Sequence, residues 1–545
     1  MRTRNPRSDY RPEARDRLTG LSNSRPPHTP SMERHLSIQN KLARPSSLLA
    51  LLMLIAYGLR LLLIINGGQL FHPDELRYYR SIETTKHIFN ADFKNAVKTL
   101  LKYEFHQGIA LAKLLPALFH RLIHSFNHDD NLLWKDLWHT PPQNFRLPAL
   151  IFALPSVLCI GMIYLIQRQA GANEGEALLS AYLLATSQSF FFFAKHLLPY
   201  DIAILIGLVA IYFALRLRAW RIMNALFVGW LAFLVFWIYN GYVTLTITIG
   251  VLYCGFLAAD PRDAFRRAFG MTGGALLFFL PIVLFNMIFL DENVFLQMMT
   301  FSETVDHGSF SEGLIFPFLY FRDVEGVMSI LWIFGLVLAA WALHSRCHSN
   351  DLRRAWMWFA CLFSLYLMLS LLSAGLQLFV VYGRVVRSLV PFIAMACAYG
   401  FSARLLRYGR GALASLVVGL GALSIANFVP AIAQQYPLEI AWEVYQTYND
   451  VSFETTVETG ENPVFSWWHL RPEVPDARYR LFNAANYYPI ANIRDDLPEG
   501  EILLQISHPF NYKPWQYEGM SPEMREIVNR SDFEIWLIDT EPSSD

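Results

Sequence analysis

The chain has 545 residues, of which 54% are hydrophobic and only 17% are charged, whereas a soluble globular domain carries roughly 25% charged residues. This composition excludes an ordinary soluble enzyme. The 45 basic and 45 acidic side chains cancel, so the net charge predicts no nucleic-acid partner, and electrostatic arguments have to be local.

The first part of the chain, residues 1–45, is rich in Arg, Pro and Ser and has no apolar face, which predicts a disordered basic tail. Apolar blocks then recur along residues 46–430, each near the roughly 20 residues that a helix needs to cross a bilayer. We therefore predict a mainly α polytopic membrane protein with about eleven transmembrane helices, near 47–67, 147–166, 176–194, 201–217, 222–241, 242–259, 268–290, 326–344, 355–377, 388–403 and 411–430.

Charges in the short loops predict the orientation. With the N-terminus in the cytoplasm, every short inside loop carries arginine, as the positive-inside rule requires, and the opposite orientation fails at each loop. The first large loop, residues 68–145, and the C-terminal region, residues 431–545, are then extracytoplasmic. The arginines concerned are Arg168, Arg216, Arg218, Arg221, Arg262, Arg266, Arg267, Arg346, Arg353, Arg354, Arg404, Arg407 and Arg410.

One further apolar stretch, residues 107–126, is also long enough to cross, but Lys113, His120, Arg121 and His124 share one sector at helical spacing. A helix that is apolar on one side and basic on the other lies in the membrane interface. Counting it as a span would invert every later loop. We expect a juxtamembrane helix inside the first loop.

The C-terminal region, residues 431–545, alternates β-like runs at 479–483, 501–506 and 533–539 with a helix signal, Ser521 as N-cap followed by Pro522. This predicts a small extracytoplasmic α/β domain. Its aromatic side chains fit either the core of such a domain or a surface that stacks on sugars.

Cysteine usage points away from disulfides and from a cysteine-based metal site. Four of the five cysteines lie inside apolar blocks, and none lies in either long polar region. They are expected to be small buried apolar side chains.

Asp74 and Glu75 open the first outside loop. Adjacent side chains on a helix point about 100° apart, so the two carboxylates cannot do the same job. One can accept a proton from an acceptor hydroxyl while the other makes a structural or substrate contact. A solvated pair of loop acids is the alternative.

Other polar residues of the outside loops are candidates for substrate binding. Glu104 and His106 precede the juxtamembrane helix, and Arg146 opens the second span. Lys195 and Asp201 lie in the turn between the third and fourth spans, where Asp201 is alternatively the N-cap of the fourth span.

Arg384 and Arg387 lie in the outside loop between the ninth and tenth spans, with no acid nearby in the sequence. Outside arginines depart from the positive-inside rule and need another reason. A lipid-linked phosphate is one, because guanidinium binds phosphate oxygens bidentately and neutralises charge on a leaving phosphate. Arg60, inside the first span, either joins them or pairs with a loop acid.

The cytoplasmic loops contain neither a glycine-rich phosphate cradle nor a paired-acid site for a nucleotide sugar. All candidate residues fall on the outer face, where a cytosolic nucleotide is not presented. The sequence therefore favours a lipid-borne donor.

In its order of motifs the chain resembles the GT-C superfamily of polytopic glycosyltransferases, which use polyprenyl-phosphate sugars. Bacterial members are related to protein O-mannosyltransferases and to the lipid A aminoarabinose transferase. The resemblance covers roughly residues 45–405. It rests on HPDE at 72–75, Glu104, RLPAL at 146–150, AKHLLPYD at 194–201 and the arginine-bearing loop at 382–387.

The resemblance implies an inverting transfer of a monosaccharide from a polyprenyl-phosphate donor to a hydroxyl of a glycan, lipid or protein acceptor. Asp74 would be the catalytic base, with Glu75 beside it as the second catalytic candidate. Arg384 and Arg387 would bind the departing phosphate, with Lys195 as a further candidate for that role. A divalent metal is not required, although Asp74 with Glu104 could hold one. The expected location is a bacterial inner membrane.

Two other classes of function remain open from the sequence. A transporter or flippase of lipid-linked sugars would also have many spans and basic outer residues, but charges at the bilayer midplane and paired broken helices are more typical of it. The other class is a non-catalytic protein of envelope polysaccharide assembly, which would tolerate loss of Asp74.

Overall fold

The computed structural model describes residues 45–69, 75, 78–101, 107–123, 142–290, 313–345, 349–378, 381, 383–405, 410–433, 436–448, 450–454, 477–483, 497, 499–507 and 534–540. Three candidate site residues, Asp74, Glu104 and His106, lie outside these described residues, as does the predicted helix start at Ser521. The account below concerns the unit that begins at Leu49.

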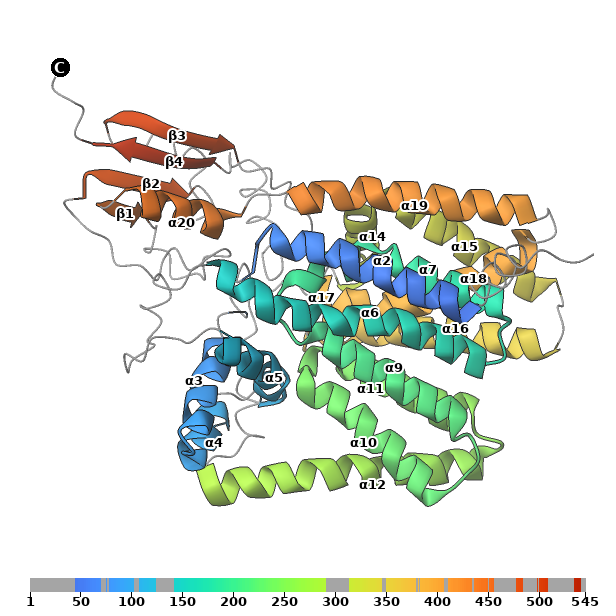
Figure 1. Ribbon diagram of the computed structural model, residues 1–545. Helices are drawn as coiled ribbons and strands as arrows, with labels where there is room; N and C mark the ends of the chain where they lie inside the picture. Colours follow the sequence, from blue (N-terminus) through green and yellow to red (C-terminus); the bar gives the residue numbers. More distant parts are fainter. Residues whose placement is uncertain are drawn as a thin grey trace, which may run out of the picture. The chain divides into compact units, whose positions relative to one another are not determined.

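The described chain is mainly helical (Figure 1). Its first half contains α2 (Pro45–Ile65), α3 (Tyr78–Phe89), α4 (Phe93–Leu101), α5 (Gln107–Ile123), η3 (Pro142–Phe145), α6 (Arg146–Gln169), α7 (Glu174–Ala185), α8 (Gln188–Phe192), η4 (Phe193–Lys195), α9 (Tyr200–Arg216), α10 (Ile222–Ile238), η5 (Asn240–Tyr242), α11 (Val243–Gly250), η6 (Val251–Phe256), α12 (Pro261–Phe285) and η7 (Asn286–Leu290). Its second half contains α14 (Phe316–Glu325), α15 (Val327–His344), α16 (Ser349–Ser370), η9 (Leu371–Gly375), α17 (Gly383–Val386), η10 (Arg387–Leu389), α18 (Val390–Leu405), α19 (Arg410–Ala433) and α20 (Pro437–Thr447).

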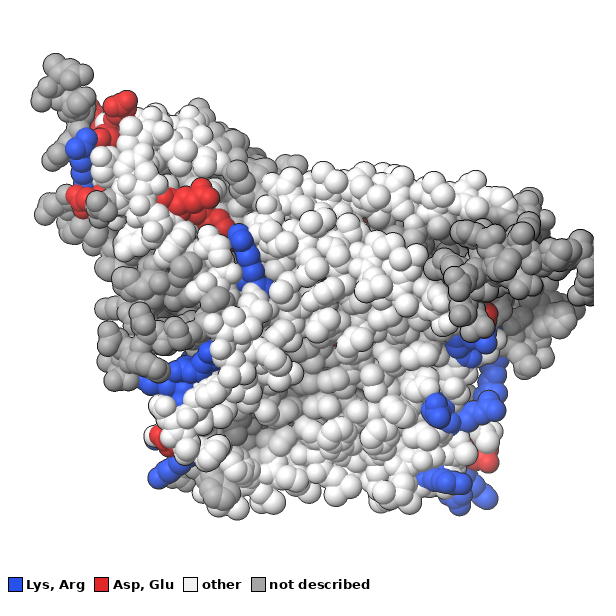
Figure 2. Space-filling model, in the orientation of Figure 1, with Lys and Arg blue, Asp and Glu red and all other residues white. Residues whose placement is uncertain are grey.

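Seven helices of the described chain are long and apolar enough to cross a membrane, or eight if the bent pair of α7 with α8–η4 is one span. The other predicted blocks form shorter helical stretches: α9 and α10 have 17 residues each, and residues 240–256 are divided among η5, α11 and η6. In Figure 2 a broad face of the helical region carries no charged side chain among the described residues, and the coloured residues lie toward its ends. These long apolar helices and the uncharged face indicate a membrane protein.

Side-chain contacts join helix ends that the sequence places on the same side of the membrane. Near the starts of α16 and α7, Arg354 and Glu176 form a buried ion pair of 2.9 Å. At the ends of α18 and α15, Arg404 donates to the Trp341 carbonyl over 3.0 Å. Both contacts join loops that the sequence places inside. The contacts at the candidate site, described below, join loops that it places outside.

Helix α18 lies at the centre of the helical region. The apolar segment within Gly383–Arg404, which includes α18, is 94% buried, whereas the apolar segment within Pro261–Ile288, which includes α12, is 11% buried. Close packing there depends on Gly400, where an added Cβ would collide with the Gly335 carbonyl of α15. Small residues at such crossings let helix backbones approach, as is usual in membrane bundles.

Near the C-terminus, a four-stranded sheet has the order β1-β2-β4-β3. β1 pairs with β2 in parallel, whereas β2 and β3 both pair with β4 antiparallel. The three predicted strands are confirmed as β2 (Tyr479–Asn483), β3 (Glu501–Ser507) and β4 (Glu534–Asp539), whereas β1 (Val451–Glu454) and α20 were not predicted. One face of the sheet packs with α20 in a single apolar cluster.

The amphipathic helix α5 has its polar sector turned toward the protein. Lys113 and His120 are buried, and the His120 Nδ1 atom lies 3.2 Å from the Tyr78 hydroxyl of α3. The opposite face exposes Leu115, Phe119 and other apolar side chains. The two faces predicted from the sequence are therefore present, and the apolar one is the exposed one.

Candidate functional site

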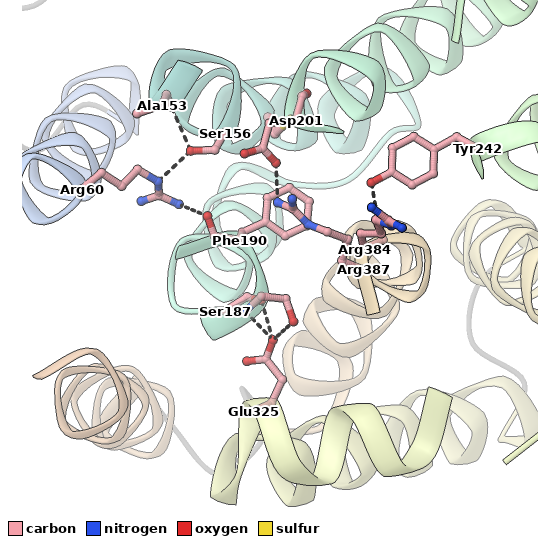
Figure 3. Close-up of polar contacts among 12 residues, drawn as sticks. Arg60, Ala153, Ser156, Ser187, Phe190, Asp201, Tyr242, Glu325, Arg384 and Arg387 are labelled. Carbon is pink, nitrogen blue, oxygen red and sulfur yellow. Dashed lines mark hydrogen bonds and ion pairs between the residues drawn. The ribbon is translucent and has the colours of Figure 1, made fainter. Parts of the chain in front are cut away.

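The candidate site is built around a break between α7 and α8, where the helix axis turns by 62°. Glu325, the last residue of α14, fixes this break. Its carboxylate accepts hydrogen bonds from the Ser187 hydroxyl at 2.8 Å, the Gln188 amide at 2.8 Å, and the amide and hydroxyl of Ser189 at 2.9 and 2.6 Å. These bonds satisfy amide groups that a helix start leaves open. Figure 3 shows Glu325 directed at Ser187.

Beyond the break, Asp201 in the first turn of α9 forms a buried ion pair with Arg387 of η10. The Arg387 guanidinium also lies 4.7 Å from the ring centre of Phe190 and 4.6 Å from that of Phe193. The sequence showed no acid near Arg387, because its partner lies 186 residues away. The N-cap of α9 is Pro199, so the alternative reading of Asp201 as N-cap is wrong.

Arg60 of α2 is fully buried beside the same pair. Its guanidinium donates to the Ser156 hydroxyl at 2.7 Å, to the Ala56 carbonyl at 2.9 Å and to the Phe190 carbonyl at 3.1 Å (Figure 3). Arg60 therefore ties α2 to α6 and α8, and these hydrogen bonds go to a hydroxyl and two carbonyls and not to a loop acid.

Arg384 is only half-buried, unlike Arg387. Its guanidinium donates to the Tyr200 hydroxyl at 2.7 Å, and its backbone carbonyl accepts from the Tyr242 hydroxyl at 2.7 Å. Two tyrosines from α9 and η5 thus position this arginine, and part of its side chain remains accessible.

Glu75, the second acid of the first loop, is fully buried against the turn that follows η4. Its carboxylate accepts the Leu197 amide at 2.6 Å and lies 3.1 Å from His196 Nδ1. Burial lowers the pKa of His196 well below its ordinary value, so a neutral ring donates from Nδ1. Of the two adjacent acids, Glu75 thus makes the structural contact.

Lys195 completes the buried turn and is 0% exposed. Its ammonium lies 3.7 Å from the ring centre of Tyr436 and 4.6 Å from that of Phe192. No residue that the structure describes accepts a hydrogen bond from it. Aromatic faces attract a cation but leave its three N–H donors unused.

Two residues of the C-terminal region, Tyr436 and Glu439, belong to the site and were missed by the sequence analysis. Glu439 accepts the Gly68 amide at 2.8 Å. Gly67 and Gly68 have φ angles of +95° and +84°, which favour glycine, and they form the turn at the start of the first outside loop. The only local signal was the pair of glycines after the first span.

The buried carboxyl of Glu439 is electrically coupled to its neighbours. Burial raises the pKa of Glu439 to about 7, although the Gly68 amide and the positive charges of Lys195 and Arg146 oppose that rise. Arg146, at the start of α6, is half-buried. The carboxyl therefore changes its charge near neutral pH.

The structure brings Glu75, Lys195, Asp201, Arg384 and Arg387 together around residues 190–201. Arg146 is linked to this group electrostatically, because its positive charge acts on the Glu439 carboxyl. The arrangement places the cationic side chains of Lys195 and Arg384 beside a turn anchored by an acid. No group of three or more metal-ligating side chains occurs among the described residues.

A cavity of about 560 Å³ opens between α14, α15, α16 and α18. Its lining is almost wholly apolar and includes Phe318, Trp332, Phe363 and Leu389, with Arg322 also contributing. Leu389 follows Arg387 on η10, so the cavity adjoins the arginine-bearing segment.

The sequence was also compared with known proteins. No family model and no curated protein matches the chain.

Proposed function

We propose that the chain is an inverting glycosyltransferase that moves a monosaccharide from a polyprenyl-phosphate donor to an acceptor hydroxyl on the extracytoplasmic face. The observation that carries the proposal is the buried Lys195 ammonium, which has no hydrogen-bond acceptor in the described part of the chain. A buried charge without hydrogen-bond partners is costly. A phosphate oxygen placed at Lys195 would supply the missing acceptor.

In this proposal the donor phosphate lies between Lys195 and Arg384. Arg387 lies nearby, but its charge is compensated by Asp201, which holds its guanidinium in place. When the bond between the sugar C1 and the phosphate oxygen breaks, negative charge grows on the phosphate. Cations positioned beforehand stabilise that charge more in the transition state than in the ground state.

Asp74 is the proposed base, next to the anchored Glu75. Its carboxylate would take the proton of the acceptor hydroxyl while the acceptor oxygen attacks C1 from the face opposite the phosphate. The sugar is transferred with inversion, and polyprenyl phosphate leaves. The apolar cavity beside Leu389 is large enough for part of an isoprenoid chain.

The proposed topology has eleven spans, an N-terminus in the cytoplasm and a C-terminus outside. It rests on the arginines of the short loops. The contacts that join loops of the same predicted side support it.

A transport function is the second candidate, favoured by the break between α7 and α8 and the charges buried beside it. Broken helices carrying ionisable groups are typical of secondary transporters. A flippase would move a lipid-linked sugar across vesicles without forming a glycosidic product. The enzyme would form the product and leave the leaflet distribution of the donor unchanged.

The decisive experiment replaces Asp74 by Asn in the purified protein. The variant keeps its shape and its donor binding but loses the base, so transfer to a hydroxyl acceptor should fall about 10²–10⁴-fold. Glu83→Gln is the matched control, because Glu83 is an exposed acid of the same loop. Wild-type turnover by Asp74→Asn would reject the proposed mechanism.

A further inference from the structure

Helix α20 reaches the candidate site from the C-terminal region, 371 residues beyond Gly68. It does so at two points: the Tyr436 ring lies against the Lys195 ammonium, and the Glu439 carboxylate holds the Gly68 amide. Tyr436 is itself buried, directly before the first residue of α20. This side of the Lys195 environment is therefore supplied by the C-terminal region.

Charged groups from several elements act on Glu439 and Lys195. Glu439 of α20 faces Lys195 of η4 and Arg146 of α6. Lys195 in turn faces Glu439 and Glu75. His196 beside Glu75 is neutral, as argued above. Burial also lowers the pKa of Lys195 to about 7, so the net charge here depends on the protonation of both Glu439 and Lys195.

We infer that the start of α20 completes the anion site. Tyr436 covers one side of Lys195, and Glu439 is a positioning residue that sets the charge beside it. This inference rests on the proposed function, because it takes the phosphate of the lipid donor as the anion. It assigns to the C-terminal region a part of the headgroup site.

The charge of Glu439 opposes an anion at Lys195. When Glu439 is neutral, the positive charge of Lys195 is available to the phosphate. When Glu439 is ionised, its carboxylate competes for the ammonium and repels the phosphate. Burial raises the pKa of Glu439 to about 7 and lowers the pKa of Lys195 to about 7. Anion binding should therefore weaken as the pH rises from 6 to 8, with Glu439 gaining a negative charge and Lys195 losing its positive one.

The test measures binding of farnesyl methyl phosphodiester, a probe that keeps one negative charge across this pH range. Full-length protein in nanodiscs is titrated at pH 6, 7 and 8. For the wild type we expect binding at least about tenfold weaker at pH 8 than at pH 6, because Glu439 gains a negative charge and Lys195 loses its positive one over this range. Glu439→Gln should keep only the smaller pH dependence that comes from Lys195.

The matched control is Glu443→Gln, one turn further along α20, where the side chain is exposed. It should keep the wild-type pH dependence. Arg146→Gln gives an independent reading that does not depend on Glu439→Gln folding. Loss of the Arg146 charge raises the pKa of Glu439 further, so the midpoint of the pH dependence should move to higher pH.

Two results overturn the inference: a wild-type pH dependence in Glu439→Gln, or an unchanged midpoint in Arg146→Gln. Failure of the proposed function gives a different result. Lys195→Met should lose binding at every pH, and if it binds the probe as the wild type does, the phosphate position itself is wrong.

Discussion

Arg384 and Arg387 are separated by only two residues, yet their surroundings differ. Arg387 is fully buried and its charge is compensated by Asp201. Arg384 is half-buried and is held by the Tyr200 hydroxyl. In the sequence both look like phosphate ligands, but the structure leaves Arg384 as the more accessible one.

The Asp201–Arg387 pair predicts a large effect on stability. Asp201→Asn leaves the buried Arg387 guanidinium uncompensated, with Arg60 close by, so it should destabilise the protein by about 3–5 kcal/mol. Thermal unfolding in detergent measures this. The double variant Asp201→Asn with Arg387→Met removes both charges and should recover much of the loss. An unchanged melting temperature in Asp201→Asn would show that the pair does not hold the fold.

Arg384 predicts a kinetic effect without a stability effect. If Arg384 contacts the donor phosphate as proposed, that contact strengthens as the phosphate departs, so Arg384→Ala should lower kcat together with donor affinity. The melting temperature should stay near that of the wild type, because the side chain is only half-buried. Donor titrations with turnover measured in parallel test this, and wild-type kinetics would make Arg384 a lipid-headgroup anchor.

The residues predicted from the sequence are those with a local signal. Lys195 and Asp201 stand out because a short polar turn interrupts two apolar blocks. Glu325 and Glu439 have no such signal, since their partners lie 136 and 371 residues away. Nothing in a single sequence indicates contacts at that separation.

At the scale of elements, the break between α7 and α8 shows what an apolar block conceals. The sequence reads 176–194 as one span, since most of its residues are apolar and suit a helix in a membrane. The only residues of this block that indicate an interruption of the helix are Thr186 and Ser187, and this indication is weak. Glu325 turns this weak signal into a sharp bend by accepting four hydrogen bonds from residues 187–189.

Glu325 should therefore be needed for the bend and for everything positioned beyond it. Glu325→Ala leaves four buried donors without an acceptor, which should cost about 3–5 kcal/mol. Asp323→Ala, two residues earlier in α14, breaks only an ion pair with the exposed Arg322 and should cost less than about 1 kcal/mol. Melting temperatures of the two variants compare them directly, and equal values would contradict the role of Glu325.

Across the whole molecule, one apolar cluster joins the C-terminal sheet to the first loop. It combines Leu481 and Leu537 of the sheet with Ile440 of α20, Ile82 of α3 and Phe152 of α6. The strands themselves could be predicted from their alternating apolar residues. Their attachment to α3 and α6 could not, because it depends on side chains that meet only in the fold.

The assignment of the site depends on the orientation of the chain, because Asp74, Arg384 and α20 have to lie on the same side of the membrane. A background variant, Cys347→Ser, removes the native cysteine of a polar loop, after which single reporters are introduced by Asp545→Cys and Arg262→Cys. Arg262 is exposed near the start of α12, in a loop expected inside. A membrane-impermeant maleimide applied to intact spheroplasts should label Asp545→Cys and leave Arg262→Cys unlabelled, since an odd number of spans from an inside N-terminus delivers the C-terminus outside. Permeabilised spheroplasts provide the control, in which both positions should react. Labelling of Arg262→Cys in intact spheroplasts would reverse the orientation and place the proposed donor site on the cytoplasmic face.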